Sequence, residues 1–282
     1  MTSTTTSVEM LASARDRGTA VGAFNVIGVE HAEAMVAGAE TAGLPVILQL
    51  SENCVRYHGA PGPMIAALLA MARAATVPVV VHLDHVESGS LVTAGLEAGV
   101  RSLMFDASTL PHEENVARTR EVVRQCRAYG ARVEAELGEI GGKDGVHAPG
   151  ARTDPGEAVR FVAGTGVDAL AVAVGSSHAM RTRTARLDLE LVGRLRAAVP
   201  VPLVLHGSSG VPDEDLLRAA HAGLSKINLA THLNGVFTGA LREVLDRDPG
   251  LTDPRRYLAP ARDALATEVT RLLALLSTEK SR

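Results

Sequence analysis

Eight short apolar runs recur along the chain, and segments with helical spacing separate them. Segments such as EHAEAMVAGAETAG and EENVARTREVVRQCRAYG carry apolar residues every three or four positions and end at a glycine. Strands that alternate with helices in this way form parallel sheets, because each helix returns the chain to the same end of the sheet. The eight expected strands lie at 20–26, 45–51, 77–84, 102–108, 132–138, 169–175, 202–208 and 226–231.

Eight such units predict an α/β chain that closes into a (β/α)8 TIM barrel. No linker or shift in composition divides the sequence, so residues 1–282 are expected to form a single domain. The late segment RYLAPARDALATEVTRLLALLS is extra to the eight units and predicts an additional C-terminal helical segment.

The charge balance and the cysteines exclude several classes of function. The formal net charge is −4 with both signs spread along the chain, and this argues against a nucleic-acid partner. Cys54 and Cys126 show neither metal-type spacing nor a disulfide framework, so both are expected to pack in a reducing, cytoplasmic setting. The N-terminus lacks a secretion signal and no run of 18 apolar residues follows, so we expect a soluble protein with no membrane partner.

Three histidines follow or close three of the apolar runs. They are His85 in HLDH, His178 after AVAVGSS, and His206 in LVLHGSSG. One such histidine is usually a hydrogen-bonded packing residue, but three that neighbour Gly, Ser or Asp favour a metal site. The carboxyl ends of all eight barrel strands open on one face, so distant imidazoles can meet there. Three neutral imidazoles with a fourth position open match catalytic Zn²⁺.

Other polar residues stand at the same strand ends and predict an acidic pocket around the histidines. Asp84 is the expected base. Strand alternation directs its side chain away from that of His85 unless the backbone turns there, and the alternative role for Asp84 is to orient a histidine. The remaining polar residues at strand ends are Asp106, Glu134, Glu136, Asn228 and Thr231.

Two glycine-rich loops are further candidates for binding. The turn HGSSG at 206–210 follows the seventh strand, where backbone N–H groups in this fold commonly hold a phosphate. The stretch at 138–153, GEIGGKDGVHAPGART, is expected either to bind or close over a ligand or to be a surface excursion.

The ordered motifs AFNV, HLDH, FDAS, VEAELG, GVDALAVAVGSSH, LVLHGSSG, KINLATHLN and DPRRYL cover nearly the whole chain. In this order they resemble the class II, zinc-dependent fructose-bisphosphate/tagatose-bisphosphate aldolases. The length and the ATHL motif are more similar to the shorter tagatose-bisphosphate branch, which also contains bacterial fructose-bisphosphate and inositol-catabolic ketose-phosphate aldolases.

The resemblance implies one catalytic zinc ion, an acid/base and a second or alternative metal position. By this resemblance the zinc ligands are His85, His178 and His206, the acid/base on the substrate C4 hydroxyl is Asp84, the loop carboxylate is Asp144, and the other metal position involves Asp106 and Glu136.

The resemblance also implies residues that bind the substrate. Gly207, Ser209, Asn228 and Thr231 align with residues that hold the ketose phosphate, and a monovalent cation can accompany them. Arg255 aligns with an arginine lent by an adjacent subunit, which implies a homodimer or homotetramer.

The implied reaction is reversible cleavage of a ketose (bis)phosphate, such as fructose 1,6-bisphosphate or tagatose 1,6-bisphosphate, to dihydroxyacetone phosphate and glyceraldehyde 3-phosphate. Zinc would polarise the C2 carbonyl and stabilise the enediolate, so no lysine Schiff base is needed. The chain has only Lys143, Lys226 and Lys280, and Lys226, at a predicted strand start, is expected at the wrong end of the barrel for chemistry.

Several positions depart from the family pattern. The loop reads GGKDG where relatives have Glu-Asp after a variable residue, so its carboxylate is either Asp144 or displaced. Ala179 stands where glycine is usual, and its Cβ would narrow a phosphate or monovalent-ion subsite. These departures leave two alternatives open, an aldolase for another ketose phosphate and a non-catalytic binding or assembly subunit. A metal-dependent barrel hydrolase is disfavoured because AFNV lacks a His-x-His pair.

Overall fold

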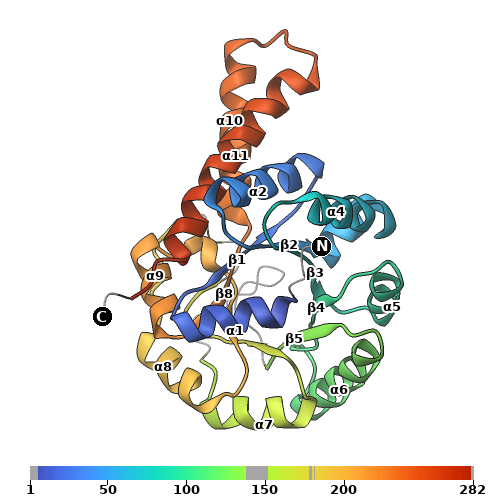
Figure 1. The fold of residues 1–282 in the computed structure, drawn as a ribbon, viewed down its shortest axis with the longest axis vertical. Helices are drawn as coiled ribbons and strands as arrows, with labels where there is room; N and C mark the ends of the chain where they lie inside the picture. The colour runs from blue at the N-terminus through green and yellow to red at the C-terminus, as the bar shows by residue number, and fades with distance from the viewer. Residues whose placement is uncertain (1–5, 138–151, 178–179, 181, 281–282) are drawn as a thin grey trace.

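The computed structural model describes residues 6–137, 152–177, 180 and 182–280 and forms a closed parallel barrel (Figure 1). The strands neighbour one another in sequence order, and the last pairs with the first. The predicted α/β TIM barrel is therefore confirmed. The strands are β1 (Val21–Asn25), β2 (Val46–Ser51), β3 (Val79–Val86), β4 (Ser102–Phe105), β5 (Arg132–Glu136), β6 (Ala169–Ala171), β7 (Leu203–Leu205) and β8 (Leu224–Leu229).

Helices surround the barrel and bury their apolar faces against the outside of the strands. The large outer core combines residues such as Phe24, Leu50 and Leu83 from strands with Met35 and Leu265 from helices. The surrounding helices are α2 (Val29–Ala42), α4 (Gly62–Ala74), α5 (Gly89–Glu97), α6 (His112–Ala128), α7 (Pro155–Thr165), α8 (Leu189–Ala198), α9 (Asp213–Ala222), α10 (Thr231–Arg247) and α11 (Pro254–Leu276).

Helix α1 (Ser7–Arg17) closes the amino-terminal end of the barrel, an element that the sequence reasoning did not include (Figure 1). Its Met10, Leu11 and Ala14 form a second apolar cluster with inward-facing strand residues such as Ala23 and Ile47. The helix begins at a capping box, in which the Thr6 side chain accepts from the Glu9 N–H and Glu9 accepts from the Thr6 N–H.

Several expected strands are shorter or shifted in the structure. β6 and β7 have three residues each, and Gly207 then adopts a left-handed conformation with φ 67°. The predicted strand at 226–231 is wrong at both ends, because β8 begins at Leu224 and ends at Leu229. Thr231 is instead the first residue of α10, so the polar positions after β8 lie at a helix N-terminus.

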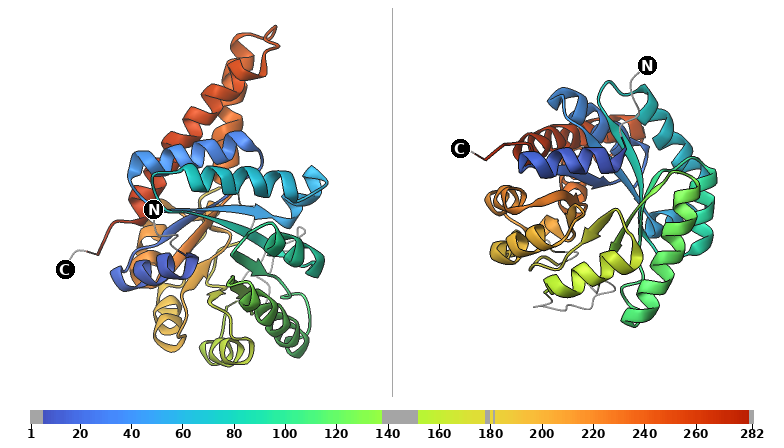
Figure 2. Two further views of the ribbon diagram at one scale, coloured as in Figure 1. Left: turned by 45° about the vertical axis from the view of Figure 1, so that its right-hand side comes forward. Right: turned by 60° about the horizontal axis from the view of Figure 1, so that its bottom comes forward.

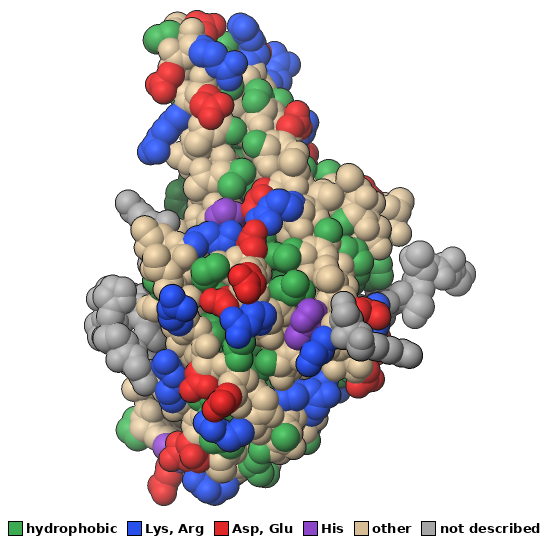
Figure 3. Space-filling model, turned by 90° about the vertical axis from the view of Figure 1, so that its left-hand side faces the viewer, with side chains coloured by type: hydrophobic (Ala, Val, Ile, Leu, Met, Phe, Trp, Pro, Cys, Tyr) green, Lys and Arg blue, Asp and Glu red, His purple; other side chains and the backbone are tan. Residues whose placement is uncertain are grey.

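The additional C-terminal helix is present as α11 and packs against α2. It pairs with α10, and the far end of this pair projects beyond the barrel (Figures 1 and 2). Acidic and basic side chains are interspersed over the face drawn in Figure 3, in keeping with the small net charge. Among the described residues, no helix is long and apolar enough to cross a membrane.

Candidate active site

A local irregularity in β3 brings Asp84 and His85 to the same side of the strand. His85 has φ 47°, the one positive φ of a non-glycine residue in the part of the chain that the structure describes, and the register with β4 shifts between Leu83 and Val86. In regular alternation the two side chains would point to opposite faces. The turn at His85 therefore allows the side chains of Asp84 and His85 to contribute to one site.

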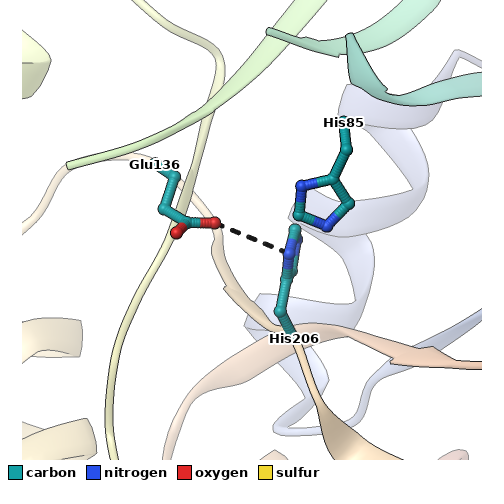
Figure 4. Close-up of side chains that lie close together, drawn as sticks. All are labelled: His85, Glu136 and His206. Carbon is teal, nitrogen blue, oxygen red and sulfur yellow. Dashed lines mark ion pairs between the residues drawn. The ribbon is translucent and has the colours of Figure 1, made fainter. Parts of the chain in front are cut away.

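His85, Glu136 and His206 converge at the carboxyl ends of β3, β5 and β7 (Figure 4). One ligand atom from each lies within 4.8 Å of the others, and Glu136 and His206 are fully buried. Two imidazoles and a carboxylate at this separation suit a divalent metal ion such as Zn²⁺. The group is the one arrangement of this kind among the described residues.

The imidazole of His85 is held by Asp106. Its Nδ1 lies 2.7 Å from Oδ2 of Asp106, whose Oδ1 accepts from the N–H and hydroxyl of Ser108. With Nδ1–H donating to the carboxylate, Nε2 is the nitrogen that can coordinate an ion. Asp106, expected at a metal position, is thus placed to orient a histidine and lies outside the group of three possible ligands.

The surrounding carboxylates also favour the protonated form of His85. Burial on its own would lower its pKa, but the charge of Asp84, the hydrogen bond to Asp106 and the charge of Glu136 outweigh it and raise the pKa to about 9. An ion that binds here must therefore displace a proton, so metal affinity is expected to rise with pH.

Asp84 is buried and accepts two hydrogen bonds from side-chain amides. Asn25 Nδ2 donates to its Oδ2 at 2.8 Å, and Gln49 Nε2 donates to its Oδ1 at 3.0 Å. Donors on both oxygens fix the orientation of the carboxylate. Asn25 and Gln49 were not predicted as site residues, although each is a polar residue within an apolar run.

On the opposite side of the site, His206 is fixed by Glu134. The His206 Nε2 lies 2.8 Å from Glu134 Oε1, and its Nδ1 lies 3.8 Å from Glu136 Oε2 (Figure 4). Nδ1 is therefore the nitrogen that faces the cluster of possible ligands. Lys226 also contributes, since its Nζ donates to Glu134 Oε2 at 2.6 Å. The prediction that Lys226 lies at the start of a strand is wrong, because it is the third residue of β8. Its side chain is buried inside the barrel.

The glycine-rich turn after β7 packs against the start of α10. The Ser209 hydroxyl accepts from the backbone N–H groups of Ala230 and His232, at 3.3 and 3.2 Å. Ser209 and Asn228 are buried, and Gly207 takes a left-handed conformation that favours glycine. The predicted phosphate-binding residues thus come from the turn after β7, from β8 and from the start of α10; they are Gly207, Ser209, Asn228 and Thr231.

One predicted site residue, Arg255, stands apart from this group. The side chain of Arg255 is 90% exposed, pairs with Asp253, and belongs to the start of α11 at the projecting end of the helix pair (Figures 1 and 2). His178 and Asp144 lie outside the described residues.

Imidazoles and a carboxylate lie together at the strand ends of a closed parallel barrel. This arrangement is typical of the class of barrel enzymes with a metal ion in the active site. Within that class, the family model "Fructose-bisphosphate aldolase class-II" matches residues 5–281. The chain belongs to this family, and it is an aldehyde-lyase.

Solved structures with the same fold include several aldolases. The YdjI aldolase from Escherichia coli K12 is 32% identical, with a TM-score of 0.84, and the match covers 98% of each chain. A protein from Coccidioides immitis, proposed to be a fructose-1,6-bisphosphate aldolase, is 29% identical with a TM-score of 0.85, over 96% of this chain and 95% of that one. A fructose-bisphosphate aldolase from Campylobacter jejuni is 21% identical with a TM-score of 0.80, over the same shares of the two chains, and supports the fold.

Proposed function

We propose that this enzyme catalyses the reversible, metal-dependent aldol cleavage of a ketose (bis)phosphate to dihydroxyacetone phosphate and an aldehyde, with glyceraldehyde 3-phosphate as the aldehyde when the substrate is a 1,6-bisphosphate. The observation that carries the proposal is the convergence of His85, Glu136 and His206 beside Asp84, at the end of the barrel where this fold performs its chemistry. Fructose 1,6-bisphosphate and tagatose 1,6-bisphosphate are the first substrates to test.

In this proposal His85 and His206 hold a Zn²⁺ ion together with His178, while Glu136 and the nearby Asp106 serve a second or alternative position. The donor set fits, since both described imidazoles are oriented by carboxylates and present one nitrogen each to the same space. When bound, the ion would supply Lewis-acid polarisation of the substrate C2 carbonyl.

Asp84 is assigned to the proton transfer. As cleavage breaks the C3–C4 bond, its carboxylate accepts the proton of the C4 hydroxyl, and in the condensation direction it returns that proton. The amides of Asn25 and Gln49 hold both oxygens in place. The proton later needed at C3 of the three-carbon fragment is assigned to Asp144 in the glycine-rich loop.

The substrate phosphate is assigned to the turn after β7 and the start of α10. Gly207, Ser209, Asn228 and Thr231 would surround it with backbone N–H groups and side-chain polar atoms, and the N-terminus of α10 favours an anion. A monovalent cation is proposed as an accompanying ligand. Arg255 would reach the second phosphate from an adjacent subunit of a cytoplasmic homodimer or homotetramer.

The test is retro-aldol cleavage of both bisphosphates by the zinc-loaded protein, with triose phosphate as the detected product. His85→Ala and exhaustive chelation should each abolish product formation, and zinc should restore it only after chelation. Cleavage that persists without metal would contradict the proposal. Zinc binding without cleavage of either sugar would favour another ketose phosphate, and failure across a ketose-phosphate panel would favour a non-catalytic role.

A further inference from the structure

A series of buried polar side chains runs through the barrel interior from the start of β4 to His206. The Ser102 hydroxyl lies 2.7 Å from His82 Nδ1, and His82 Nε2 lies 3.4 Å from Lys226 Nζ. Lys226 donates to Glu134 at 2.6 Å, and the other oxygen of Glu134 lies 2.8 Å from His206 Nε2. The series therefore connects the floor of the barrel to one of the possible metal ligands.

The series contains one ion pair and one neutral imidazole. Lys226 and Glu134 are 1% and 3% exposed and form an ion pair. Burial and then the charge of Lys226 hold the pKa of His82 well below its usual value, so His82 is neutral. A neutral His82 can accept from the lysine through Nε2 and donate to Ser102 through Nδ1.

Packing alone does not require an ion pair at this depth. Neighbouring interior positions are filled by alanine and valine, including Ala23, Ala169 and Val204. An apolar side chain usually fills such space at no loss of stability, since two buried charges must first lose their hydration. The ion pair instead does something an apolar residue cannot, because it fixes the carboxylate that faces His206.

We propose that Lys226 is a positioning residue for the metal site. Its ammonium group donates to Glu134 and fixes the orientation of that side chain, so that Glu134 accepts the Nε2 proton of His206 and Nδ1 faces the cluster of ligands. This inference rests on the proposed function in one respect, the assignment of His206 as a metal ligand. Lys226, the one lysine in the barrel interior among the described residues, thus acts at a distance on the metal, without contact with substrate.

The decisive measurement is zinc affinity, determined by competition with a chromogenic chelator at constant pH. Lys226→Met removes the charge and keeps most of the volume, so we expect zinc affinity to fall about 10- to 100-fold, the usual effect of losing such an outer partner. The visible absorption of the cobalt-substituted protein should change as the geometry at His206 relaxes. Unchanged affinity and an unchanged cobalt spectrum, even with a lower Tm, would overturn the inference.

A double-mutant cycle tests whether Lys226 acts through Glu134. Glu134→Gln alone should weaken zinc binding by a similar factor, and adding Lys226→Met to it should cause little further loss. If the two substitutions instead lower zinc affinity by independent factors that multiply, Lys226 does not act through Glu134. If Lys226→Met does not fold, Lys226→Gln keeps a donor without the charge and should still weaken binding about threefold to tenfold; wild-type affinity in that variant would again overturn the inference.

Leu265→Ala is the control for destabilisation alone. Leu265 is fully buried in α11, so its truncation should lower Tm while zinc affinity stays at the wild-type level. Failure of the wild-type protein to bind zinc would overturn the proposed metal site, and the inference with it. Wild-type zinc binding with no effect of Lys226→Met would overturn the inference alone.

Discussion

His85 shows how one backbone angle decides what a short motif can do. In HLDH, regular alternation would direct His82 and Asp84 into the barrel and His85 away from it. The φ of 47° at His85 and the register shift beside it let all three side chains contribute to the interior or its rim. A left-handed conformation in a non-glycine residue is costly, and such residues concentrate at functional sites.

Asp84→Asn should separate proton transfer from metal binding. The substitution removes the carboxylate that accepts the C4 hydroxyl proton, so kcat should fall by about 10²- to 10⁴-fold. Zinc should still bind, because Asp84 is outside the group of possible ligands. Steady-state retro-aldol kinetics and chelator competition check both expectations, with the exposed Asp263→Asn as control. Near-normal kcat would reassign the base.

Much of the site could be predicted from strand ends, and the missing parts have physical reasons. His85, Glu136 and His206 stand where buried strands end, and a polar residue in that position is a strong signal. Asn25 and Gln49 also face Asp84, but each reads as one polar residue in an apolar run, and only the barrel geometry shows what it bonds. The turn at His85 gives no compositional signal at all.

At the scale of elements, the alternation of strands and helices predicted the barrel, whereas the ends of elements depended on tertiary contacts. β6 ends at Ala171 although apolar residues continue to Val174. This end could not be predicted, because the apolar composition does not reveal where the pairing between strands stops. α1 went unpredicted because its residues become an inner layer only when Met10 and Leu11 meet the barrel floor.

The contact between α2 and α11 depends on Gly38. A Cβ at this position would lie 2.7 Å from the Ala266 carbonyl oxygen and 2.7 Å from Val269 Cγ1. Because a helix backbone cannot move away as a side chain can, Gly38→Ala should destabilise the protein by about 1–3 kcal/mol. Urea unfolding measures this difference in the free energy of unfolding.

Gly193→Ala is the matched control in α8. No described atom lies within 4 Å of a Cβ at Gly193, so alanine should stabilise the helix by about 0.5–1 kcal/mol. Equal effects of the two substitutions would show that the close approach of α2 and α11 is not what requires Gly38.

Glu268 connects α11 to α10 and, through Arg271, to Asp213 of α9. Burial alone would raise the pKa of Glu268, but hydrogen bonds from Arg271 and His232 outweigh it and lower the pKa from 4.5 to about 2. A carboxyl group whose pKa is lowered on folding stabilises the protein when the pH is above the pKa of that group in the unfolded state. That contribution is lost as the pH falls from about 4.5 towards 2.

Glu268→Gln should therefore cost on the order of 2 kcal/mol at pH 6.5, after allowance for solvent screening of the partly exposed Arg271. The difference in unfolding free energy between variant and wild type should shrink at pH 3.5. At that pH, below the unfolded pKa of about 4.5, the stabilisation from ionised Glu268 has begun to fall. Urea unfolding at both pH values measures it, with the exposed Glu97→Gln as control. A difference that stays constant or grows on acidification would contradict this account.

At the scale of the whole molecule, the far end of the pair α10–α11 projects beyond the barrel (Figures 1 and 2), and Arg255 belongs to the first turn of α11. Its ion pair with Asp253, the N-cap residue of α11, keeps the guanidinium beside the start of that helix. If Arg255 binds the second phosphate, the site it serves belongs to another copy of the chain. Assembly would then be a condition for full activity on a bisphosphate.

Mixed oligomers test this arrangement directly. Arg255→Ala and Asp84→Asn should each be impaired alone, the first mainly through a higher KM for a bisphosphate. In a mixed dimer one site combines the intact Asp84 of one chain with the intact Arg255 of the other, so co-expression in equal amounts should restore about a quarter of wild-type activity at low substrate. Activity no greater than the mean of the separate variants would show that Arg255 serves its own subunit or no site at all. Recovery above that mean would make the dimer, rather than the single barrel, the complete catalytic unit.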